Sequence, residues 1–116
     1  MRQCSAVLES LTTTLFAVIS SHIKSVRLLN ERIGLSDTSF VELVVWQLPN
    51  VTPERPHGFK YRLALVSEGV CVMRYDNEAG KGDHRHLGAS EFDYVFAGLE
   101  QLQLDFWADV QQWRLE

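Results

Sequence analysis

The densest group of reactive side chains lies in one short stretch, MRYDNEAGKGDHRH, which runs from Met73 to His86. Histidine has a pKa of about 6.5, so it can take up or release a proton near neutral pH. Arginine can bind a phosphate through paired N–H donors. Cleavage of RNA without a metal needs a base for the 2′-hydroxyl, an acid for the leaving 5′-oxygen and a cation for the phosphate. The stretch contains all of these groups.

The residue types suggest a role for each side chain. His84 and His86 are candidates for the base and the acid, Arg74 and Arg85 can hold the phosphate, and either Asp76 or Asp83 can fix the tautomer of an imidazole. The predicted catalytic group comprises Arg74, Asp76, His84 and His86. The predicted substrate-binding group comprises Arg85, Lys81, Tyr75, Asn77 and Arg62.

Two other interpretations of the same stretch stay open. A His-x-His pair on an extended segment can bind a divalent ion, which would make the protein a metal-dependent nuclease or hydrolase. No second ligand cluster accompanies this pair, because His22 and His57 are isolated, and we expect neither a metal nor a cofactor. Alternatively, GKGD is a solvated turn in a noncatalytic protein-binding module, since the charges from Arg74 to His86 cancel.

Apolar spacing predicts the elements that must position these groups. Apolar residues recur every three or four positions in the first part of the chain, which predicts a helix within residues 1–22. The same spacing from Leu99 to Trp113 predicts a helix within residues 95–114. Between them, residues 23–88 contain extended segments separated by turn-forming residues, and FKYRLALV alternates cleanly between two faces. The segment HRHLG fits either a short strand or a loop.

This order of elements predicts a single α+β domain over residues 1–116. We expect an antiparallel meander sheet of four or five strands, packed on one face by an N-terminal and a C-terminal helix. A doubly wound fold is excluded because parallel strands need crossover helices, and helices are predicted only at the two ends. Arg74 and Asp76 then share one face of the fourth strand, with Tyr75 and Asn77 on the other.

Composition narrows the range of partners and locations. The 116 residues have a formal net charge of −4, so any contact with nucleic acid must be local. Glu9 interrupts the apolar N-terminal stretch, and no segment approaches the roughly 20 apolar residues of a membrane span. We therefore predict a cytoplasmic protein that does not contact the membrane.

Three motifs together resemble a known family. SFVELVVWQLP, then RYDN (residues 74–77), then HRH (residues 84–86) are similar to the TumE-like proteins, and the likeness runs from about Ile23 to Trp113. The resemblance implies a growth-inhibiting toxin of a prokaryotic toxin–antitoxin pair that acts on RNA. It also implies a cognate helix-turn-helix antitoxin as partner. A second copy of the chain is a further candidate partner, and the resemblance together with the residue chemistry favours a ribonuclease-type enzyme.

Overall fold

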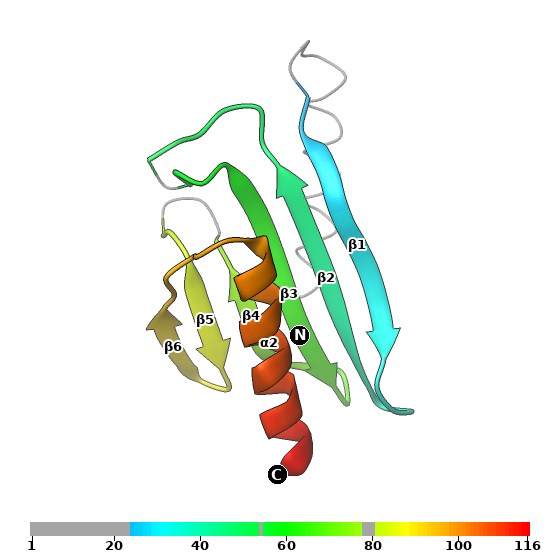
Figure 1. The fold of residues 1–116 in the computed structure, drawn as a ribbon. Helices are drawn as coiled ribbons and strands as arrows, with labels where there is room; N and C mark the ends of the chain where they lie inside the picture. Colours follow the sequence, from blue (N-terminus) through cyan, green and yellow to red (C-terminus); the bar gives the residue numbers. More distant parts are fainter. Residues whose placement is uncertain (1–23, 54, 78–80) are drawn as a thin grey trace.

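The computed structural model describes residues 24–53, 55–77 and 81–116, and these residues form one antiparallel sheet with a helix on one face (Figure 1). The sheet has six strands in the order β1-β2-β3-β4-β5-β6, so each strand pairs with its neighbours in sequence. The strands are β1 (Val26–Gly34), β2 (Ser39–Gln47), β3 (Phe59–Ser67), β4 (Val70–Asp76), β5 (His84–Leu87) and β6 (Ser90–Asp93). The meander is confirmed, whereas the expectation of four or five strands was too low.

Strand β6 was not predicted because its four residues, SEFD, are all exposed and show no apolar pattern. The strand forms because a two-residue turn follows β5 and reverses the chain. Gly88 in this turn has a φ of 60°, which is the left-handed conformation that glycine adopts without strain. HRHL is thereby a true strand, and it pairs on both sides.

The alternation of the strands divides the sheet into two faces. Helix α2 (Leu99–Leu115) packs on one face, where its fully buried residues Leu102, Phe106 and Val110 meet the core side chains of β2, β3 and β4. These strand residues are Val41, Leu43, Val45, Tyr61, Leu63, Leu65, Met73 and Tyr75. The opposite face buries a smaller apolar group on β2 and β3, namely Val44, Trp46, Ala64 and Val66.

The two predicted helices have different outcomes. The C-terminal helix is confirmed, but it begins at Leu99 rather than near residue 95, because Gly98 has a φ of 109° that a helix cannot continue through. The predicted helix over residues 1–22 lies outside the described residues. Of the two helices expected to pack on one face of the sheet, the structure describes α2.

The turn between β3 and β4 offers a direct test of local strain. Glu68 has a φ of 52° and Gly69 a φ of 76°, as a type I′ hairpin turn requires. Asn tolerates this conformation better than Glu. We expect Glu68→Asn to raise the free energy of unfolding by about 0.5 to 1 kcal/mol, a fraction of the cost of a left-handed residue. Urea denaturation measures this change, and an unaltered or lower midpoint would contradict it.

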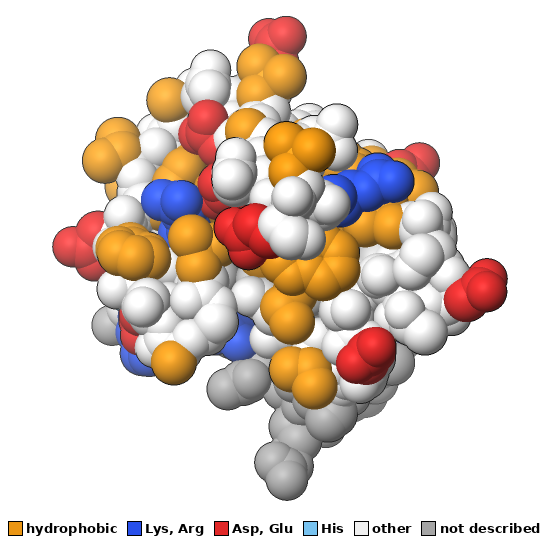
Figure 2. Space-filling model, turned by 90° about the horizontal axis from the view of Figure 1, so that it is seen from below, with side chains coloured by type: hydrophobic (Ala, Val, Ile, Leu, Met, Phe, Trp, Pro, Cys, Tyr) orange, Lys and Arg blue, Asp and Glu red, His pale blue; other side chains and the backbone are white. Residues whose placement is uncertain are grey.

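Charges on the surface are mixed in sign. The end of the molecule seen from below shows acidic and basic side chains interspersed among hydrophobic ones (Figure 2). No helix in the described part of the chain combines the length and apolar character needed to cross a membrane.

Candidate functional site

The face of the sheet opposite α2 carries a group of polar side chains on β3, β4, β5 and β6. The pairing of β4 with β5 places Arg74 opposite His86 and Asp76 opposite His84. Since alternate residues of a strand point to the same face, all four side chains lie together. Lys81, in the segment before β5, lies beside these side chains. We call the whole group the polar cluster, and it comprises Arg62, Arg74, Asp76, Lys81, His84, His86 and Glu91.

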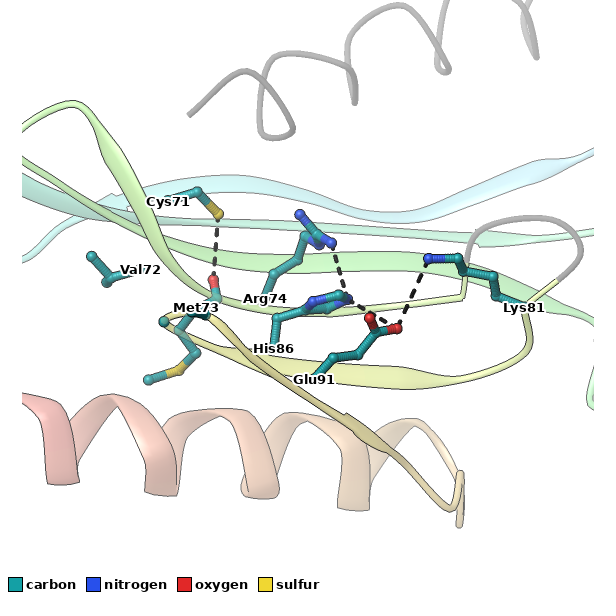
Figure 3. A pocket seen from close by; sticks show the side chains of 9 residues that line it. Cys71, Val72, Met73, Arg74, Lys81, His86 and Glu91 are labelled. Carbon is teal, nitrogen blue, oxygen red and sulfur yellow. Dashed lines mark hydrogen bonds and ion pairs between the residues drawn. The ribbon is translucent and has the colours of Figure 1, made fainter.

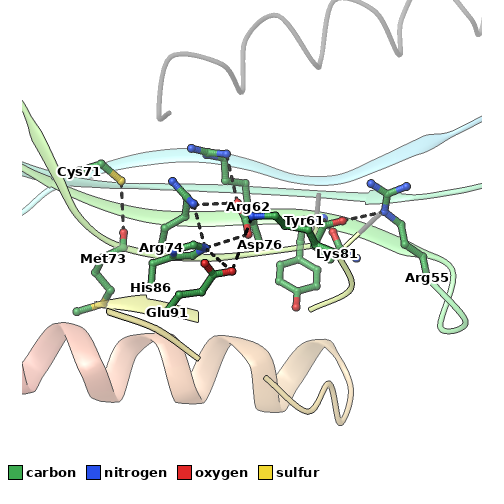
Figure 4. Close-up of polar contacts among 11 residues, drawn as sticks. Arg55, Tyr61, Arg62, Cys71, Met73, Arg74, Asp76, Lys81, His86 and Glu91 are labelled. Atoms are coloured by element: carbon green, nitrogen blue, oxygen red, sulfur yellow. Dashed lines mark hydrogen bonds and ion pairs between the residues drawn. The ribbon is translucent and has the colours of Figure 1, made fainter. Parts of the chain in front are cut away.

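Asp76 is the buried centre of the polar cluster. Its side chain is 5% exposed, and its Oδ2 lies 2.9 Å from Nε of Arg74 and 3.4 Å from Nη1 of Arg62 (Figure 4). Two guanidinium groups on neighbouring strands therefore share one carboxylate. Such an arrangement fixes the direction of both arginines, since a buried charge is tolerated only when it is paired.

Arg74 also reaches across to β5. Its Nη2 donates a hydrogen bond to Nε2 of His86 at 2.9 Å (Figure 3). A guanidinium cannot accept, so Nε2 of His86 carries the lone pair and the imidazole is neutral. Burial, followed by the charge of Arg74, lowers the pKa of His86 below its ordinary value, although Asp76 and Glu91 oppose the shift. His86 is thus poised to accept a proton at neutral pH.

His84, with a side chain 13% exposed, and Glu91, 42% exposed, complete the polar cluster. Nε2 of His84 lies 3.5 Å from Oε2 of Glu91, and the rings of His84 and His86 are 6.4 Å apart between centroids. Nδ1 of His84 is buried and has no hydrogen-bond partner among the described residues.

A cavity of about 360 Å³ opens beside these groups. Arg74, Lys81, His86 and Glu91 line it together with the turn residues Gly88 and Ala89. The labelled side chains of Arg74, His86, Glu91 and Lys81 converge there, on the side of the sheet away from α2 (Figure 3). Side-chain exposure rises from 5% at Asp76 to 42% at Glu91, so the cluster is buried at β4 and open at β6.

Three of the predicted substrate-binding residues lie away from the polar cluster. Arg85 points to the helix side, where its Nε donates to Oδ2 of Asp109 at 2.8 Å. The hydroxyl of Tyr75 donates to the same carboxylate at 2.5 Å, and burial together with this bond raises its pKa. The amide of Asn77 bonds the backbone of β3, accepting from the N–H of Tyr61 and donating to the C=O of Phe59. Arg62 and Lys81 do belong to the cluster.

The contact between His57 and Asp83 was not predicted from the sequence. His57 is isolated in the sequence, yet its side chain is only 15% exposed, and its Nε2 lies 3.0 Å from Oδ2 of Asp83. Its Nδ1 accepts from the N–H of Phe59, which assigns the proton to Nε2. The Tyr61 hydroxyl donates to Asp83 as well. Asp83 therefore faces His57 on the helix side and orients neither His84 nor His86.

The described residues contain no group of three His, Cys, Asp or Glu side chains arranged to hold a metal ion. The charged and imidazole side chains that line the cavity are those of Arg74, Lys81, His86 and Glu91. This arrangement can transfer protons through its imidazoles beside positively charged guanidinium and ammonium groups.

The fold and the site define a small α+β protein whose sheet carries a helix on one face and an imidazole–guanidinium cluster on the other. The family model described as Toxin TumE matches residues 11–114, so the chain belongs to the TumE toxin family. The match begins earlier than the predicted likeness from Ile23 and reaches into the N-terminal segment. No curated protein and no solved structure matches the chain. Membership of a toxin family implies a cognate antitoxin partner.

Proposed function

We propose that the chain is the toxin of a toxin–antitoxin pair and that it cleaves RNA at the polar cluster without a metal. One observation carries this proposal: the neutral imidazole of His86, bonded to Arg74 at 2.9 Å, borders an open cavity with a second imidazole nearby. A neutral base beside a fixed cation, with an acid within reach, is the group that phosphodiester cleavage by internal attack requires.

In the proposed reaction, Nη2 of Arg74 turns from Nε2 of His86 to a phosphate oxygen when RNA binds, which frees the lone pair of Nε2. That nitrogen then takes the proton of the 2′-hydroxyl while the 2′-oxygen forms a bond to phosphorus. The bond from phosphorus to the 5′-oxygen breaks, and protonated His84 gives its proton to that oxygen. The products are a 2′,3′-cyclic phosphate and a free 5′-hydroxyl. Arg74 and Lys81 offset the charge on the phosphate oxygens. The ring centroids are 6.4 Å apart, so both imidazoles are close enough to act on the oxygens of one nucleotide linkage.

The test uses the purified full chain, single-stranded RNA oligonucleotides and an excess of chelator. We expect cleavage in the presence of chelator, with fragments that end in a cyclic phosphate. Activity that chelator abolishes and an added divalent metal restores would instead favour the metal-dependent nuclease. Intact RNA, together with unaffected growth on overexpression, would favour the noncatalytic protein-binding module.

The partner side of the proposal has its own test. We infer that the antitoxin is a helix-turn-helix protein encoded beside this chain, and that it neutralises the toxin. Coexpression with the neighbouring reading frame is expected to restore growth. A neighbour without such a helix pair, or one that leaves growth inhibited, would contradict this inference. Size-exclusion chromatography of the purified chain tests whether it also forms a homodimer.

A further inference from the structure

Glu91 is the one carboxylate of the polar cluster that lies near both imidazoles and the open cavity. Its Oε2 lies 3.5 Å from Nε2 of His84, 4.0 Å from Nε2 of His86 and 4.0 Å from Nζ of Lys81. Glu91 sits on β6, where the two-residue turn after β5 sets it directly opposite His86. One oxygen atom is therefore within reach of both groups that exchange protons in the proposed reaction.

We propose that Glu91 is a positioning residue that serves as the shared counter-ion of His84 and His86. This inference rests on the proposed function. Before cleavage the proton is on His84, and after it the proton is on His86, because one imidazole has given a proton and the other has taken one. The Glu91 carboxylate lies beside both imidazoles, so it can pair with protonated His84 before cleavage and with protonated His86 after it, without movement of the backbone.

The other charged groups around the imidazoles cannot take this role. Asp76 also approaches His86, with Oδ1 at 3.9 Å from Nε2, but its carboxylate already pairs with Arg62 and Arg74. Asp93 pairs with His84 in the strand register, yet its carboxylate forms no ion pair with a described residue. The cation nearest to Glu91 apart from the histidines is Lys81, which is 64% exposed and at 4.0 Å, so this pair is weak.

The experiment compares Glu91→Gln with Glu100→Gln, an equivalent change in the first turn of α2 on the other side of the sheet. Imidazole resonances are titrated by NMR, and RNA cleavage is measured in chelator. Glutamine keeps the size of the side chain and removes its charge. We expect Glu91→Gln to lower the pKa of His86 further, because the carboxylate that favours its protonated form is gone.

Cleavage by Glu91→Gln is expected to fall about 10- to 100-fold, by analogy with the loss found when a carboxylate that orients a metal-bound imidazole is removed. Glu100→Gln should change neither quantity. If Glu91→Gln leaves the titration of His86 unmoved, the counter-ion role is overturned, and a loss of cleavage in that case would mark a purely structural role.

The titration also separates the two proposals. If the unsubstituted protein does not cleave RNA, the proposed function fails, while a shift of the His86 titration in Glu91→Gln still establishes that the carboxylate is coupled to the imidazole. If the protein cleaves RNA and Glu91→Gln behaves as the unsubstituted chain in both measurements, the proposed function stands and the inference about Glu91 fails.

Discussion

Replacement of His86 by glutamine is expected to lower the rate of RNA cleavage by about 100- to 10,000-fold, the usual contribution of positioned acid–base catalysis. Glutamine can still accept the hydrogen bond from Arg74, but it cannot take the proton of the 2′-hydroxyl. The loss should appear in kcat more than in KM, because the cation that binds the phosphate stays in place. Fluorogenic RNA cleavage in chelator measures both constants.

The pH dependence of cleavage follows from the environment of His86. A base must be neutral to act, and burial and Arg74 lower the pKa of this imidazole. The acidic limb of kcat/KM is therefore expected below pH 6.5, the ordinary value for histidine, so cleavage is retained as the pH falls to that value and is lost below it. In His86→Gln this limb should disappear from the residual activity.

His57→Gln is the matched control for His86→Gln. His57 lies on the helix side, where it stacks on Phe96 and faces Asp83, away from the cavity. We expect its substitution to leave cleavage within a few-fold of the unsubstituted rate, provided that denaturation shows both variants folded. Equal losses in the two variants, or full activity in His86→Gln, would reject His86 as the base.

Asp76→Ala is expected to lower the free energy of unfolding by about 3 to 5 kcal/mol, because it removes the carboxylate that pairs two buried guanidinium groups. In this variant the guanidinium groups of Arg62 and Arg74 lose the carboxylate of Asp76 while they remain largely shielded from water. Denaturation in urea measures the loss, and cleavage should fall too, since Asp76 fixes the direction of Arg74.

The control for Asp76→Ala is Glu42→Ala, which breaks the ion pair of Glu42 with Arg32 at 2.6 Å on the same sheet. Arg32 is 62% exposed, so this loss should cost only about 0 to 1 kcal/mol. An Asp76→Ala variant as stable as Glu42→Ala would show that Asp76 is not the electrostatic centre of the cluster. Asp76→Asn, which keeps the shape of the side chain, should lie between the two.

The parts of the site that the sequence could predict depend on alternation within a strand. Arg74 and Asp76 were placed on one face of β4 and Tyr75 on the other because strand residues alternate, and the register agrees. Asn77, predicted on the face of Tyr75, lies beyond the end of β4, so the register does not test its placement. The same rule separates Arg85 from its two neighbouring histidines. That separation was missed because HRHLG fitted a loop as well as a strand, and a loop has no fixed faces.

Contacts between distant elements could not be predicted in the same way. His57 meets Asp83 only because the loop before β3 folds beside the segment before β5, and no periodic pattern links these two positions. Glu91 joins the imidazoles through a strand too short and too polar to be detected. The predicted beginning of α2 was four residues too early, because apolar spacing does not reveal the backbone angle of Gly98.

The turn of two residues between β5 and β6 has a consequence for how the site can be lost. Strand geometry reverses the orientation of every side chain when the chain is displaced by one residue. A shift of β6 by one residue against β5 would bring the side chain of Phe92 to the face of the imidazoles and turn Glu91 away from them. Such a shift would take the site apart although each residue of the polar cluster is still encoded.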